Sequence, residues 1–116
     1  METFDVVKMM ADSPNTFLSF GDMNGHSFGA VDITGRNPGW EMHPDTDEFF
    51  YVIGGEMEIT LLEDSRANHH VAPAGSAFVV PRGIWHKPEA PKGAQIIYFT
   101  PGESLVSEAE DPRTET

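Results

Sequence analysis

The chain has 116 residues, no cysteine and a formal net charge of −12, from 19 acidic and 7 basic side chains. Without cysteine the chain can form neither disulfides nor thiolate metal sites, so His, Asp and Glu remain as its metal ligands. The excess of acidic residues argues against binding to nucleic acid, because phosphates would be repelled.

The N-terminal residues 1–5 contain no basic stretch followed by an apolar run, so we expect no signal peptide. No apolar run is long enough to cross a bilayer, and we expect a soluble, cytoplasmic protein that does not bind membranes. A short helix is weakly indicated at Asp5–Met10, which precedes the first apolar runs.

The middle of the chain is typical of strands and turns. Its 11 glycines and 9 prolines interrupt it often, and no segment carries a sustained helical apolar stripe. Short apolar runs between turn residues predict an all-β sandwich or barrel. The expected strands are Thr16–Phe20, Phe28–Ile33, Glu48–Ile53, Met57–Leu62, Ala77–Val80 and Ala94–Thr100.

Two neighbouring runs predict how their strands are placed. Polar and apolar residues alternate from Glu56 to Leu61, which indicates a strand with one wet and one dry face. The run Phe49–Ile53 is apolar on both faces, so its strand should lie centrally in the sheet. Between them, Gly54-Gly55 predicts a tight turn.

The C-terminal segment differs in composition from the rest. Residues 103–116 hold five acids and one base, and their large apolar residues are Leu105 and Val106. Such a composition is typical of a mobile or loosely packed segment. We therefore divide the chain into a single barrel domain, residues 1–102, and a mobile acidic tail, residues 103–116.

Two separated segments carry the candidate site. Glu41 and His43 are two residues apart, so on a strand both side chains point to the same face. Glu48 opens the next apolar strand after a turn-prone stretch and can face the same interior. Further along, an apolar strand runs into the turn Pro81-x-Gly83, which would aim His86 back at that interior. Oxygen and nitrogen donors that converge at about 2.0–2.2 Å suit a divalent metal.

These two segments resemble the two signature motifs of the cupin superfamily, in its small single-domain (cupin 2-type) form. In both motifs every spacing fits, and the resemblance covers roughly residues 26–101. The residues that match the first motif are Gly35, Glu41, His43, Glu48 and Gly55. The residues that match the second motif are Gly75, Pro81, Gly83 and His86.

The resemblance implies a double-stranded β-helix (jelly-roll) barrel that holds one divalent metal ion. His43, Glu48 and His86 match three of the usual four ligands, and Glu41 stands where the first motif histidine normally is. Glu41 could be the fourth ligand, or it could be a free general base beside an open coordination position. Two histidines with one carboxylate suit Fe(II), whereas further carboxylates favour harder ions such as Mn²⁺. The metal therefore stays open among Fe, Mn, Zn and Ni.

The resemblance also directs the expectation about function. We expect a metal-dependent enzyme that acts on a small organic molecule, as an oxygenase, an isomerase or epimerase, or a lyase. Glu41 and Glu48 are the candidate catalytic residues, because a carboxylate in a partly dry barrel suits proton abstraction. The alternatives are a non-catalytic ligand-binding or sensor domain and a metal-free barrel that assembles with itself or with another protein. Small barrels of this family often pair, so we expect a homodimer.

Overall fold

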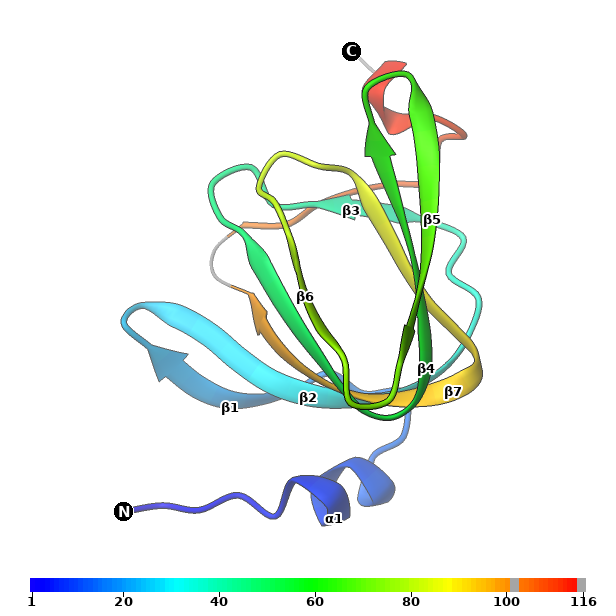
Figure 1. Cartoon of the computed structure of the whole chain (residues 1–116). Helices are drawn as coiled ribbons and strands as arrows, with labels where there is room; N and C mark the ends of the chain where they lie inside the picture. The colour runs from blue at the N-terminus through cyan, green and yellow to red at the C-terminus, as the bar shows by residue number, and fades with distance from the viewer. Residues whose placement is uncertain (101–102, 115–116) are drawn as a thin grey trace.

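The structure is a computed structural model that describes residues 1–100 and 103–114. It is mostly β, with a short helix beneath a strongly curled sheet (Figure 1). Its elements are α1 (Val6–Asp12), β1 (Leu18–Met23), β2 (His26–Gly35), β3 (Trp40–Met42), β4 (Glu48–Glu63), β5 (Arg66–Pro73), β6 (Ala77–Val80), β7 (His86–Thr100), β8 (Leu105–Ser107) and the 3₁₀ helix η1 (Pro112–Thr114).

The strands form an antiparallel sheet that curls on itself as a half-barrel. Strands β1, β2, β7, β3 and β8 are hydrogen-bonded in that order, while β4 pairs with β5, β6 and β7. The two longest strands, β4 and β7, pair along two stretches: residues 49–52 face residues 96–99, and residues 58–61 face residues 86–89. This architecture confirms the predicted all-β fold of the jelly-roll type.

The predicted turn at Gly54-Gly55 is wrong. Both glycines lie inside β4, which runs unbroken through what the sequence indicated as two strands. The register between β4 and β7 shifts at this point. Gly55 has a φ of 72°, and a Cβ atom on it would overlap the carbonyl oxygen of Gly93 in β7. Glycine therefore lets the two strands bend while they stay in contact, and this bend curls the sheet.

The burial pattern of β4 follows its sequence alternation. In its second half Met57 and Ile59 are buried while Glu56 is exposed, which confirms the predicted wet and dry faces. In its first half the strand is central, as predicted, because it pairs with β6 on one side and β7 on the other. Its inner residues Phe50 and Val52 are buried in the core. Each such buried side chain contributes roughly 1.5–3 kcal/mol of hydrophobic stabilisation.

The weakly indicated N-terminal helix is present as α1. The carboxylate of Asp5 caps it by accepting a hydrogen bond from the backbone amide of Lys8 at 3.2 Å. Met10 is its buried residue, and the helix packs against β2. Within residues 1–100 and 103–114, no helix combines the length and the apolar character that spanning a membrane requires.

The C-terminal segment contributes a strand, which differs from the expectation of a loosely packed tail. Strand β8 pairs with β3 so that Val106 faces Glu41 and Leu105 faces Met42. Pairing at a strand edge gives backbone N–H and C=O groups hydrogen-bond partners that they would otherwise lack. This stabilisation outweighs the tendency of an acidic segment to stay solvated. The boundary predicted after residue 102 and the last two residues of the predicted tail, 115–116, lie outside the described residues. The mobility of the segment stays a prediction.

Candidate metal centre

The four candidate residues come from three strands of the curled sheet. Glu41 lies in β3, Glu48 opens β4 and His86 opens β7, while His43 directly follows β3. Glu41 faces His86 in the β3–β7 pairing, and the amide of Gly83 donates to the carbonyl oxygen of His43 at 2.8 Å. These contacts bring the two motif segments together although they are about 40 residues apart.

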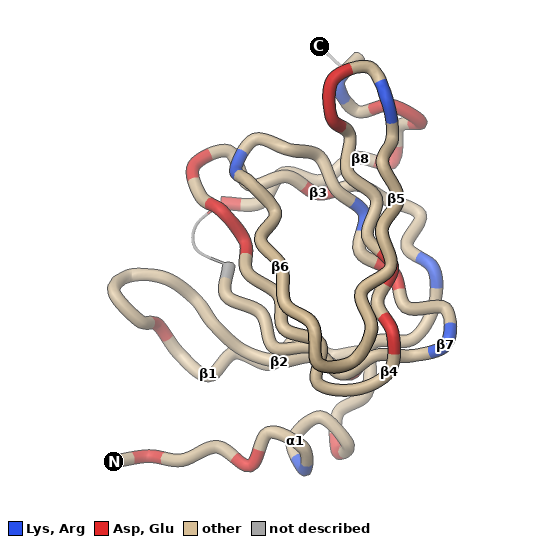
Figure 2. Tube along the Cα trace, in the orientation of Figure 1, with Lys and Arg blue, Asp and Glu red and all other residues tan. Residues whose placement is uncertain are grey.

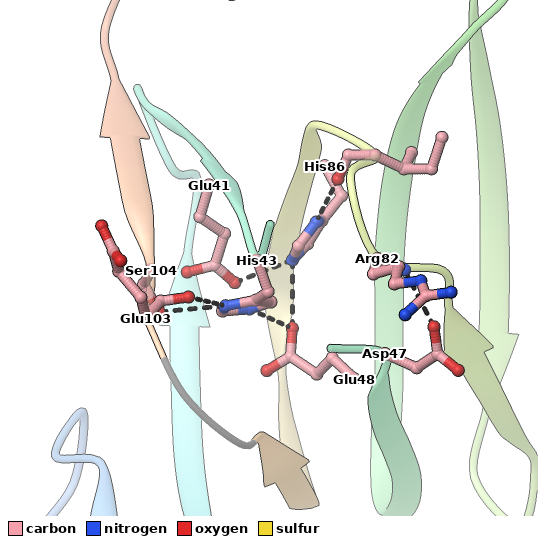
Figure 3. Close-up of polar contacts among 9 residues, drawn as sticks. Glu41, His43, Asp47, Glu48, Arg82, His86, Glu103 and Ser104 are labelled. Atoms are coloured by element: carbon pink, nitrogen blue, oxygen red, sulfur yellow. Dashed lines mark hydrogen bonds and ion pairs between the residues drawn. The ribbon is translucent and has the colours of Figure 1, made fainter. Parts of the chain in front are cut away.

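A neighbouring acid, Asp47, supports the site from outside. It points away from the centre (Figure 3), and its Oδ1 accepts a hydrogen bond from the backbone amide of Arg82 at 2.9 Å. Arg82 belongs to the turn that leads into β7 and His86. Asp47 therefore fixes the turn that places one of the candidate ligands.

The four side chains point toward one another (Figure 3). Oε1 of Glu48 lies 3.1 Å from Nε2 of His43 and 3.0 Å from Nε2 of His86, and Oε1 of Glu41 lies 3.1 Å from the same His86 atom. One donor atom from each residue lies within 4.8 Å of the other three. His43, Glu48 and His86 are only 4%, 5% and 0% exposed, whereas the Glu41 side chain is 29% exposed. The structure thus brings together all four residues identified from the sequence.

In both histidines Nδ1, the ring nitrogen that faces away from the carboxylates, also has a hydrogen-bond partner. Nδ1 of His86 donates to the carbonyl oxygen of Ile84 at 3.0 Å. Nδ1 of His43 lies 3.3 Å from the carbonyl oxygen of Glu103 and 3.0 Å from the hydroxyl oxygen of Ser104. A carbonyl oxygen can only accept, so these contacts place a hydrogen on Nδ1 and direct Nε2 toward the carboxylates. Outer hydrogen bonds of this kind orient histidines that bind metals.

The carboxylates hold protons on the histidines. Burial by itself lowers the pKa of His86, but hydrogen bonds to Glu41 and Glu48 outweigh it and raise that pKa to about 9. Burial also lowers the pKa of His43, and the hydrogen bond and negative charge of Glu48 more than offset it, so this pKa is raised from 6.5. When both rings are protonated, two imidazolium cations balance two carboxylates.

The donor set fits a divalent metal ion. Donors at about 2.0–2.2 Å from one ion lie at most about 4.4 Å apart, so the present spread of 4.8 Å needs a contraction of only a few tenths of an ångström. A divalent ion would replace the two imidazolium protons without changing the charge of the site. Imidazole nitrogens and carboxylate oxygens serve several divalent metals, so this set does not identify the ion.

A cavity of about 330 Å³ adjoins the centre. Its volume lies at the lower end of the range for small-molecule sites. Three of the four candidate ligands reach its wall, whereas His86 is fully buried. Apolar side chains from the inner faces of β2, β4 and β7 form most of the remainder. The lining consists of Phe17, Ser27, Val31, Ile33, Glu41, His43, Glu48, Phe50, Met57, Pro88, Ile96, Tyr98 and Ser104.

Sequence reasoning missed two contributors to the site, the carbonyl of Glu103 and the hydroxyl of Ser104. Both contact His43, and both belong to the segment that was expected to be a tail. The apolar pair Leu105–Val106 within an acidic stretch is the signal that could have indicated a strand there. That strand, β8, carries the segment back over the site.

Comparison with known proteins places this geometry in a family. The family model described as cupin domain matches residues 31–100. The uncharacterized protein YdbB of Bacillus subtilis (strain 168) is 32% identical over 70 residues, a match that covers 60% of this chain and 58% of the relative. The chain therefore aligns with less than two thirds of that relative's length.

Solved structures share the fold. A cupin-2 domain containing protein from Shewanella frigidimarina is 26% identical, with a TM-score of 0.72 over 85% of this chain and 94% of that one. Hydroquinone 1,2-dioxygenase PnpCD, in complex with Cd²⁺ and 4-hydroxybenzonitrile, is 18% identical, with a TM-score of 0.70 over 85% of this chain and 72% of that one. The second likeness is a likeness of fold.

Proposed function

Because this chain belongs to the cupin domain family, we propose that it is a metal-dependent enzyme for a small organic molecule. His43, Glu48 and His86 are the metal ligands, and Glu41 is either the fourth ligand or a general base beside the ion. The observation that carries this proposal is the convergence of four nitrogen and oxygen donors, three of them buried, beside an apolar cavity. Buried carboxylates and imidazoles without a shared proton or ion would be costly, and a divalent cation can take the place of the two histidine protons.

The two carboxylates divide into different roles. Glu48 is buried and touches both histidines, so we assign it to holding the ion. Glu41 is partly exposed and borders the cavity, which makes it the better proton acceptor, with Glu48 as the second candidate. A bound divalent ion would supply Lewis-acid activation of a substrate oxygen or a binding place for O₂. Apolar side chains form most of the cavity wall, so few of its groups would bind water.

The reaction class stays open among oxygenase, isomerase or epimerase, and lyase. The likeness to hydroquinone dioxygenase is one of fold, and a fold does not select a reaction. A non-catalytic ligand-binding or sensor domain would use the same cavity and the same donors. Turnover is the property that separates the two.

Metal analysis tests the first half of the proposal. Protein prepared without chelators should carry one divalent ion per chain by mass spectrometry of the metal. His43→Ala and His86→Ala should lose the ion and should melt at a lower temperature than the metal-loaded protein. His70→Ala, which removes an exposed histidine in β5, should keep both properties. Absence of stoichiometric metal, with no change in the two site variants, would contradict the proposal.

A turnover assay tests the second half. A panel of small carbonyl and phenol-type compounds, incubated with and without O₂, should show activity that His86→Ala abolishes. If Glu41 is the base, Glu41→Gln should keep the metal and lose turnover. If Glu41 is a ligand, the same variant should bind the metal more weakly. Tight binding without any turnover would instead favour the sensor function.

A further inference from the structure

The wall of the cavity beside the metal centre holds carboxylate, imidazole, hydroxyl and apolar side chains. No lysine or arginine of the described residues lines it, and all seven basic residues of the chain belong to that described part. Three of the seven are paired with acids on the surface, and the ammonium of Lys87 lies over the ring of Trp40, 4.5 Å from its centre. Most of the basic segments accordingly lie around the periphery of the trace (Figure 2).

Apolar and aromatic groups surround the space instead. Val31 faces Ile96, and Phe50 faces Tyr98, across adjacent strands of the sheet. Phe17 stands at the rim, 62% exposed, with its ring edge-on to Tyr98 at a centroid distance of 5.6 Å. An anion that entered this space would lose its hydration, and no lysine or arginine of the cavity wall would compensate its charge.

Neutral polar groups are nevertheless present. The hydroxyl of Tyr98 donates to the carbonyl oxygen of Leu18 at 2.8 Å, which leaves its oxygen able to accept. Ser27 pairs with Thr100, and Phe49 pairs with Phe99, so Ser27 lies level with Glu48 but two strands away. At about 4.8 Å per strand, that separation is about 10 Å. Among the described residues, the Ser27 hydroxyl has no hydrogen-bond partner.

We propose that the substrate is an uncharged molecule with an apolar, ring-sized body. One hydroxyl or carbonyl oxygen faces the metal, and a neutral polar group lies at the far end, toward Ser27. The metal-facing half of this inference rests on the proposed function. The preference for a neutral molecule rests on the cavity wall, which holds carboxylates and apolar groups but, among the described residues, no lysine or arginine.

An isosteric pair of probes tests this preference. 4-Hydroxyphenylacetamide and 4-hydroxyphenylacetate have the same shape and the same phenol, and they differ in charge at the far end. Both are titrated by calorimetry into protein loaded with Co²⁺ and into metal-free protein. The amide should bind at least about tenfold more tightly than the acetate, because the acetate charge would be buried without a partner. Equal or tighter binding of the acetate, or no binding of either probe, would overturn the inference.

Two arginine variants locate the origin of the preference. Phe17→Arg places a cation at the rim, where the native side chain is already mostly exposed. Val71→Arg adds the same charge elsewhere on the surface, in β5, at a residue that is 51% exposed and absent from the cavity wall. Phe17→Arg should tighten binding of the acetate severalfold and narrow the difference in affinity between the probes, while Val71→Arg leaves that difference unchanged. Equal effects of both variants would show that net charge, not the cavity wall, sets the preference.

The two proposals can fail separately. Uptake of Co²⁺, followed by its visible absorption, tests the metal site alone. If no Co²⁺ binds, the proposed function fails, and selective binding of the amide to metal-free protein still supports the neutral cavity. If Co²⁺ binds at the site and the acetate is preferred, the metal centre stands and the inference about the substrate is wrong.

Discussion

The protons held by the buried histidines give the metal-free protein a defined dependence on pH. The pKa of His86 is raised from 6.5 to about 9 in the folded chain. Because the folded state binds this proton more tightly than the unfolded state, the stabilisation is fully present below pH 6.5 and is lost as the pH rises through about 9. The gap between these two values corresponds to about 3 kcal/mol. The pKa of His43 is raised as well, so its contribution has the same sign.

Urea denaturation in the presence of a chelator measures this effect. Between pH 6.5 and pH 9 the free energy of unfolding of the metal-free protein should fall by up to about 3 kcal/mol. Zn²⁺-loaded protein should lose less stability, because the ion takes the place of the protons. His86→Gln should flatten the dependence, and His70→Ala should leave it intact. If the metal-free wild type is equally stable at both ends of this range, or more stable at pH 9, then the carboxylates do not hold a proton on His86.

Three further predictions concern the contacts around the site and the outer face. Ser104→Ala should weaken metal affinity about tenfold at unchanged stoichiometry in a chelator competition, because a histidine ligand loses an orienting partner. Gly29→Ala should destabilise the fold by about 1–3 kcal/mol or more, because the added Cβ would overlap the backbone of β1. Thermal melts measure this loss, and an unchanged melting temperature would contradict the close contact between Gly29 and β1. The homodimer stays a prediction. Phe49 and Val79 are exposed on paired strands, so glutamate at either position should shift a dimer toward monomer in sedimentation, whereas wild type that sediments as a monomer would refute it.

The candidate site could be predicted from the sequence because its residues depend on local rules. Strand alternation places Glu41 and His43 on one face, and the turn at Pro81 fixes where His86 points. Both rules act over a few residues, and the structure follows them. The division of β4 at Gly54-Gly55 was wrong for a related reason. Paired glycines are typical of a tight turn and equally suit a bent strand, and the contact with Gly93 that decides between them comes from a distant strand.

The C-terminal contribution could not be predicted from local rules. Glu103 and Ser104 meet His43 about 60 residues away in sequence, and the pairing of β8 with β3 brings them there. The composition of residues 103–116 suggests a solvated tail, since few apolar groups favour burial. What the sequence does not display is the open edge of a three-residue strand, β3, which a second short strand can cover. Long-range pairing of this kind depends on the assembled sheet.

Glu41 stands where the family motif has histidine, and its carboxylate changes the net charge of the metal-loaded site. This charge bears on whether the site attracts an anionic or a neutral substrate. With histidine at that position, the donor set would hold one carboxylate, and a divalent ion would leave the site with one positive charge. With Glu41 the two carboxylates cancel the ion, so the site offers an anion little attraction. Glu41→His should therefore increase the affinity for 4-hydroxyphenylacetate relative to the neutral amide, measured on Co²⁺-loaded protein. An unchanged ratio, with the metal still bound, would show that the cavity wall alone excludes the anion.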